Sequence, residues 1–131
     1  FISIRDADKN KIILNVAKTL KEVGFSIIAT SGTQKFLQEN KIESKVINKV
    51  LDGSPHIVDA IKAGNVALVI NTTEGEKSIA DSFSIRRTAL LNKIPYTTTA
   101  NGAREMAKAI KRLSSDLGLE VRTLQSYSDA P

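Results

Sequence analysis

Cysteine and tryptophan are absent from this 131-residue chain, and histidine and methionine each occur once. Without cysteine the chain has no disulfides, no thiolate nucleophile and no cysteine-based zinc site, which fits a reducing, cytoplasmic environment. A single histidine leaves no second imidazole for a zinc centre. Aromatic residues make up only 5% of the chain, too few for the stacking platforms of single-strand nucleic-acid binders. No apolar run approaches the length of a membrane span, and the start shows no signal-peptide pattern.

Among the charged residues, positive side chains outnumber negative ones. Lys and Arg number 19 against 14 Asp and Glu, for a net charge of +5. This balance is typical of a solvated basic surface, and it also suits an anionic small ligand or an acidic neighbouring surface. The length predicts one domain with a sizeable core, and 41% hydrophobic residues are usual for a soluble globular protein. Because the chain starts at Phe1 inside an expected strand, we expect a piece excised from a longer protein.

Apolar segments with strand character alternate with segments of helical period. The spacing predicts helices through residues 12–23, 33–40, 57–64, 76–90 and 100–113, the last with Met106, Ala109 and Ile110 inward. The polar connection Asp6–Asn10 is expected to start the first helix, since Asp and Asn favour caps, and Gly24 to end it. This alternation predicts an α/β fold, a three-layer sandwich whose five-stranded parallel sheet carries helices on both faces. The expected strands are Phe1–Arg5, Phe25–Ala29, Ser44–Val50, Val66–Ile70 and Ile94–Thr98, with a short extended piece at Leu119–Leu124.

The most informative stretch begins with the apolar run Val66–Ile70, which reads as a strand buried on both faces. It stops at Asn71, and the amide, hydroxyl and glycine groups of Thr72–Gly75 follow. In α/β sheets ligands bind beyond the carboxyl ends of the strands. Neutral polar groups at such a position suit recognition of a small polar molecule better than acid–base chemistry.

Right-handed crossovers place all the carboxyl ends of the strands at one edge. The loops there supply Lys9, Thr30–Thr33, Asn71–Thr73 and Thr97–Thr99, and Lys49 adds a further charge. Helix N-termini, hydroxyl groups and Gly32 together predict a site for phosphate or a phosphorylated metabolite. Taken singly, the threonines are equally well explained as helix N-caps.

Other titratable residues carry weaker signals. His56 is expected to be a surface or capping residue, and Asp52, Asp59 and Asp81 to be solvated or capping rather than catalytic. Arg86 and Arg87 point about 100° apart on a helix. One is expected to be solvated or to contact another domain, and the other to support the loop or reach an anion.

Six ordered motifs covering nearly the whole chain resemble one family. The chain is similar to the carboxy-terminal allosteric domain of the large subunit of glutamine-dependent carbamoyl-phosphate synthase, bacterial type. That resemblance implies a methylglyoxal-synthase-like, Rossmann-like fold. The motifs are residues 1–9, 24–33, 48–50, 53–57, 69–73 and 81–87.

The resemblance implies regulation without catalysis by this domain. UMP and IMP would share one site, and ornithine would activate at the junction with a neighbouring synthetase domain. The parent enzyme would use ATP, Mg or Mn, and K, with a small glutaminase subunit, for arginine and pyrimidine synthesis. No cofactor, metal, nucleic acid or membrane is implied for the domain itself. Thr98 matches the ornithine side, and the residues matching the nucleotide site are Lys9, Thr30, Thr33, Lys49, Val50, Asn71, Thr73, Asp81, Ser82 and Ile85.

Two departures and three alternatives accompany this resemblance. Family members often carry two basic residues where this chain has Glu76 and Lys77, and an acid there would weaken nucleotide binding. Thr97 replaces an acidic residue of some relatives.

The first alternative, a methylglyoxal synthase-type lyase, needs a Gly-Gly-Asp loop and a histidine after the fourth strand, and this chain has neither. The others are the cyclohydrolase domain of purine synthesis and a stand-alone phosphometabolite-binding module.

Overall fold

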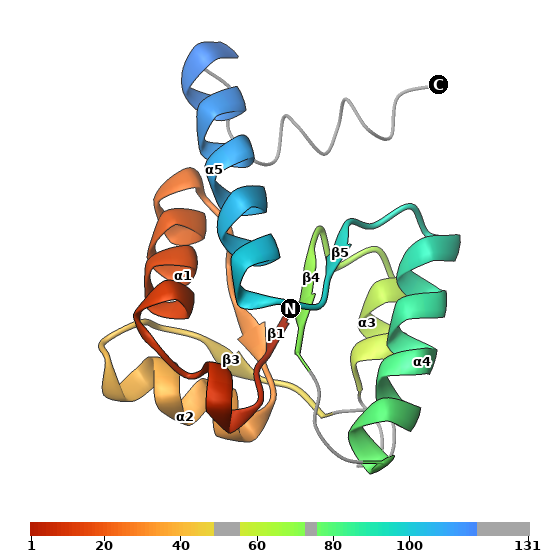
Figure 1. Cartoon of the computed structure of the whole chain (residues 1–131). Helices are drawn as coiled ribbons and strands as arrows, with labels where there is room; N and C mark the ends of the chain where they lie inside the picture. Colours follow the sequence, from red (N-terminus) through yellow and green to blue (C-terminus); the bar gives the residue numbers. More distant parts are fainter. Residues whose placement is uncertain (49–55, 73–75, 118–131) are drawn as a thin grey trace.

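Five parallel strands form one sheet in the order β3-β2-β1-β4-β5 (Figure 1). The computed structural model describes residues 1–48, 56–72 and 76–117, with the backbone alone for 76–81 and 116–117. The predicted α/β fold is confirmed. The strands are β1 Ile2–Ser3, β2 Ile28–Ala29, β3 Lys45–Val46, β4 Val69–Asn71 and β5 Tyr96–Thr97; the helices are the 3-10 turn η1 Asp6–Asp8 and α1 Lys11–Val23, α2 Ser31–Glu39, α3 Ile57–Lys62, α4 Glu76–Leu91 and α5 Ala100–Leu117.

Helix α1 shows why the local sequence folds as it does. Asn10 is its N-cap, and the side chain accepts a hydrogen bond from the Ile12 N–H at 3.0 Å. Gly24 ends the helix with a φ of 113°, a left-handed conformation that suits glycine. The predicted helix start within Asp6–Asn10 and the predicted stop at Gly24 are confirmed. Asn10 thereby places the preceding residue, Lys9, at the carboxyl edge of the sheet.

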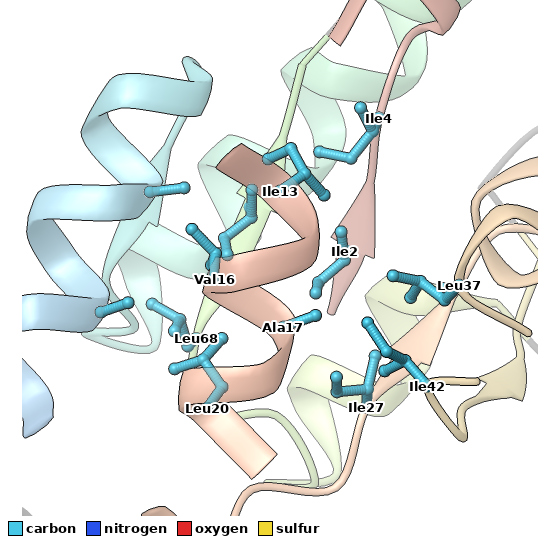
Figure 2. Packing of buried hydrophobic residues seen from close by; sticks show 14 residues of the cluster. Ile2, Ile4, Ile13, Val16, Ala17, Leu20, Ile27, Leu37, Ile42 and Leu68 are labelled. Atoms are coloured by element: carbon cyan, nitrogen blue, oxygen red, sulfur yellow. The ribbon is translucent and has the colours of Figure 1, made fainter. Parts of the chain in front are cut away.

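Two apolar clusters hold helices against the two faces of the sheet. The first joins one sheet face to α1, α2 and α5, around Ile2, Ile13 and Leu37 (Figure 2). The second joins the other face to α3 and α4, around Ile57 and Ile85. Figure 1 shows α1 and α5 on one side of the strands and α3 and α4 on the other. The three-layer prediction is therefore confirmed.

Several predicted boundaries differ from those observed. The strands are shorter than the apolar segments: Phe1 and Ile4, for example, are buried but lie outside β1. On α5 the prediction is confirmed for Met106 and Ile110, which pack against the first core cluster, and was wrong for Ala109. Ala109 is exposed because it lies about 200° around the helix from the buried Ala107. The predicted extended piece 119–124 lies outside the described residues.

Within the described part of the chain, no helix combines the length and apolarity needed to span a membrane.

Gly102 lies in the first turn of α5, where a side chain has no room. A Cβ atom there would overlap Thr97 Oγ1 and lie 2.9 Å from Thr99 Oγ1. We expect Gly102→Ala to lower the free energy of unfolding by about 1–3 kcal/mol, the usual cost of overpacking. Urea unfolding would measure it, with the exposed Asn101→Ala as the matched control. A Gly102→Ala variant that is more stable than the wild type would contradict the prediction, since helix propensity alone favours alanine.

Candidate functional site

A polar row crosses the sheet where three strands end. Ser3 pairs in register with Asn71, and Ile2 pairs with Ala29, which places Thr30 on the other side of Ser3. The Thr30 hydroxyl lies 3.2 Å from Ser3 Oγ, within hydrogen-bond distance. Ser3 is 3% exposed and Asn71 is fully buried. The predicted convergence of Thr30 and Asn71 is confirmed, and we call Thr30, Ser3 and Asn71 the polar row.

Lys9 places a positive charge beside the amino end of α2. Its Nζ lies 3.4 Å from the position that a Cβ atom of Gly32 would occupy. The same ammonium donates a hydrogen bond to Asp6 Oδ1 at 2.6 Å, and this bond together with the charge of Lys9 lowers the pKa of Asp6. Because the free N–H groups of a helix N-terminus also favour negative charge, an anion near Gly32 would meet two sources of attraction.

The hydroxyl groups of Thr33 and Thr72 brace this edge. Thr33 Oγ1 accepts a hydrogen bond from the Ile4 N–H at 2.9 Å, and Thr72 Oγ1 accepts one from the Arg5 N–H at 2.9 Å. Both threonines are buried. Thr30 occupies the N-cap position of α2 but makes no side-chain cap, because its hydroxyl bonds to Ser3 and Thr33 instead. The predicted ligand role of Thr33 stays a prediction, with its hydroxyl already engaged.

Asn71 connects β4 to the next helix and strand. Its Nδ2 donates to Ser82 Oγ at 2.8 Å and to the Tyr96 hydroxyl at 3.0 Å. Its Oδ1 is buried without a hydrogen-bond partner. This oxygen can therefore still accept a hydrogen bond. Ser82 is half-buried beside it, and Ile85 is fully buried in the second core cluster. Ser82 therefore joins the site directly, whereas Ile85 supports it from within the core.

An open cleft of about 430 Å³ lies beside the row, between α4 and β5. Thr98, the predicted residue on the ornithine side, lines it. Tyr96 belongs to both the polar row's surroundings and the cleft. Its hydroxyl accepts a hydrogen bond from Asn71, and its ring centroid lies 6.0 Å from the Arg86 guanidinium carbon. The described lining residues are Arg86, Leu90, Ile94, Tyr96, Thr97 and Thr98.

Some predicted site residues cannot be placed. Lys49, Val50 and Thr73 lie outside the described residues, as does the side chain of Asp81 in α4. Sequence reasoning missed Ser3 and Tyr96. A serine inside an apolar strand and a tyrosine next to a strand end were the available signals, but neither shows which groups lie opposite until the strand register is known.

His56 stands apart from the polar row. It occupies the N-cap position of α3 without a side-chain cap, and its Nε2 lies 3.6 Å from Asp59 Oδ2. Among the described residues, no group of three His, Asp or Glu side chains is arranged to hold a metal ion. Hydroxyl and amide groups form the polar row itself, and the ammonium group of Lys9 lies at the amino end of α2.

Comparison with known proteins gives a consistent result. The family described as "MGS-like domain" matches residues 12–98. Three similar proteins are named carbamoyl phosphate synthase large chain: those of Mesorhizobium japonicum (52% identical), Rhizobium meliloti (51%) and Brucella suis (49%). Each match covers 97% of this chain but only 11% of the relative. The chain therefore spans a small part of the length of the curated relatives it matches.

Proposed function

This chain belongs to the MGS-like domain family, and from that premise we propose that it is the effector-binding regulatory domain of a carbamoyl phosphate synthase large chain. In this proposal the domain catalyses no step itself. It binds UMP or IMP at the carboxyl edge of the sheet and senses ornithine at the α4–β5 cleft. The parent enzyme is cytoplasmic, acts with a glutaminase subunit, and supplies carbamoyl phosphate to arginine and pyrimidine synthesis.

The observation that carries the nucleotide proposal is the position of Lys9. Its ammonium group lies over Gly32 at the amino end of α2, next to Thr30. A phosphate there would gain a charge-assisted hydrogen bond from Lys9 and would face the backbone N–H groups of the helix. Asp6, which binds Lys9 now, is almost fully exposed, so a phosphate would compete with it at little cost in desolvation.

The polar row suits the remainder of a nucleotide. Ser3 and Thr30 offer hydroxyl groups, and Asn71 Oδ1 offers a buried acceptor without a partner. A ribose hydroxyl or a base N–H can donate to such an acceptor. Hydroxyl and amide groups do not ionise near neutral pH, so this row supports recognition rather than the acid–base chemistry of a lyase reaction.

The cleft between α4 and β5 suits a ligand shared with another domain. None of its described lining residues is acidic. Ornithine carries two ammonium groups, so carboxylates from a facing domain would have to pair with them. Tyr96 adjoins both this cleft and Asn71, which supports communication between the two proposed effector sites.

Calorimetric titration tests the nucleotide proposal. UMP and IMP, added separately to the folded chain, should each give saturable heat with one site, and each should displace the other. The chain should not convert dihydroxyacetone phosphate to methylglyoxal. If neither nucleotide binds while circular dichroism shows a folded chain, regulation by these nucleotides is wrong. If dihydroxyacetone phosphate is consumed, the lyase alternative replaces it.

Removing the Lys9 charge should weaken nucleotide binding. We expect Lys9→Ala to cost about 1–3 kcal/mol of UMP binding free energy, the range for a hydrogen bond to a charged group. Lys18→Ala, an exposed lysine on α1, is the matched control and should leave the affinity unchanged. Equal affinities for wild type, Lys9→Ala and Lys18→Ala would place the phosphate elsewhere.

A further inference from the structure

The two carboxylates of the short turn η1 pair with different cations. Asp6 Oδ1 accepts a hydrogen bond from Lys9 Nζ at 2.6 Å. Asp8 Oδ2 accepts one from Arg5 Nε at 2.7 Å. Lys9 is also the residue whose ammonium group lies over Gly32 at the amino end of α2. A carboxylate of the chain itself is therefore bound to the cation that the proposed phosphate would use.

The two partners of the Asp6–Lys9 pair differ in how freely each can move. The Asp6 side chain is 91% exposed, whereas the Lys9 side chain is only 21% exposed. Because most of the Lys9 side chain is packed against the protein, its position does not depend on Asp6 alone. Water reaches most of the Asp6 side chain, so its carboxylate is readily hydrated when the pair opens. The carboxylate is therefore the partner that can leave.

The place of Lys9 at a helix start explains why a carboxylate pairs with it. The amino end of a helix carries a partial positive charge, which disfavours an ammonium group and favours an anion. The first turn of α2 contains no acidic residue. The hydrogen bond from Lys9 and the charge of Lys9 lower the pKa of Asp6, so its carboxylate is ionised at neutral pH. Asp6 thus supplies part of the negative charge that a phosphate would bring.

We propose that Asp6 is a built-in competitor of the effector phosphate: its carboxylate holds the Lys9 ammonium and releases it as the phosphate binds. This inference rests on the proposed function, because it concerns the same nucleotide site. The competition lowers the affinity for the nucleotide without changing the groups that contact it. Asp6 therefore sets the nucleotide concentration at which the domain responds, and leaves the choice between nucleotides to the rest of the site.

The exchange favours a phosphate over the carboxylate for two reasons. A phosphate monoester carries more negative charge than a carboxylate and offers more acceptor oxygens. It would also face the backbone N–H groups at the start of α2. The ion pair that it breaks is weak, since Asp6 is exposed to water. We therefore expect Asp6 to reduce nucleotide affinity by a small factor, about three- to fivefold, and not to block the site.

Calorimetric titration of UMP and IMP into the full-length parent chain tests this competition. Asp6→Asn keeps the size of the side chain and removes its charge. We expect the Kd of both nucleotides to fall by the same factor, about three- to fivefold, because they share the phosphate. Asp8→Asn removes the same charge from the same turn and is the matched control. Since Asp8 pairs with Arg5, this control should change each Kd by less than about 1.5-fold.

Two results of this titration would overturn the proposal. An unchanged Kd in Asp6→Asn would show that the carboxylate does not compete with the phosphate. A higher Kd would show that Asp6 instead positions Lys9 for the phosphate. A gain of the same size in Asp8→Asn would also contradict the proposal, because it would reflect the net charge of the turn and not the bond to Lys9.

A double-mutant cycle separates competition from simple repulsion. A carboxylate repels a phosphate whether or not Lys9 is present, but it competes only for an ammonium group that exists. In the Lys9→Ala background we therefore expect Asp6→Asn to change the Kd of UMP by less than about 1.5-fold. A gain as large as that in the wild-type background would contradict competition for Lys9.

Wild-type binding distinguishes a failure of this inference from a failure of the proposed function. Binding by the wild type with no gain in Asp6→Asn contradicts the competition alone. Binding by Asp6→Asn without binding by the wild type supports the competition and contradicts regulation of the natural chain by these nucleotides. Absence of binding in both contradicts both proposals.

Discussion

Ile13→Ala should destabilise the domain by about 2–5 kcal/mol, the range measured for Ile-to-Ala changes in cores. Ile13 is fully buried on α1 and packs with Ile2 and Val16 in the first core cluster. Figure 2 shows its side chain pointing between α1 and β1. The truncation removes three carbon atoms and leaves a cavity that rigid neighbours on the sheet can fill only in part. Urea unfolding followed by circular dichroism would measure the loss.

Two further variants show whether burial causes the loss. Ile13→Val should cost about 0.5–1.5 kcal/mol, because one methylene is removed. Leu90→Ala removes a side chain that is 76% exposed, so it should change stability by no more than about 0.5 kcal/mol. An Ile13→Ala variant no less stable than Leu90→Ala would contradict the packing of α1 on the sheet.

The layer architecture was predictable because it follows from local pattern and simple topology. The run Val66–Ile70 lacks alternation because β4 is covered on both faces: Val69 belongs to one cluster and Ile70 to the other. Once such strands alternate with amphipathic helices, right-handed crossovers bring their carboxyl ends together. That step was sufficient to place Lys9, Thr30 and Asn71 at one edge.

The finer arrangement depends on contacts between distant segments, which local pattern does not contain. The role of Ser3 follows from a register that places it between Thr30 and Asn71. Thr33 is four positions from Ala29 in sequence, but its hydroxyl accepts from the N–H of Ile4, just after β1. On α5, Met106 and Ile110 pack against the first core cluster as predicted, whereas Ala109 was assigned wrongly, because it and the buried Ala107 are the same residue type and their local sequence does not tell them apart.

Blocking the amino group of a chain that starts at Phe1 should stabilise the domain most in acid. The Phe1 amino group donates to the Leu68 carbonyl at 2.8 Å inside the fold, and burial lowers its pKa from 8.0 to about 5. Between pH 8 and 5 the unfolded chain binds a proton that the folded chain does not. The free energy of unfolding should therefore fall as the pH falls through this window, by about 4 kcal/mol in all, and level off below pH 5.

Acetylation of the Phe1 amino group supplies the comparison. The amide that forms cannot be protonated and still carries one N–H for the Leu68 carbonyl. The two forms differ only at this group, so the difference between the two stabilities isolates this amine. We expect that difference to be largest near pH 5, smaller at pH 7, and smallest above pH 9, where both forms are neutral at this position. Urea unfolding at these three pH values would measure it, and a difference that does not change with pH would show that the amino group is solvated in the folded chain.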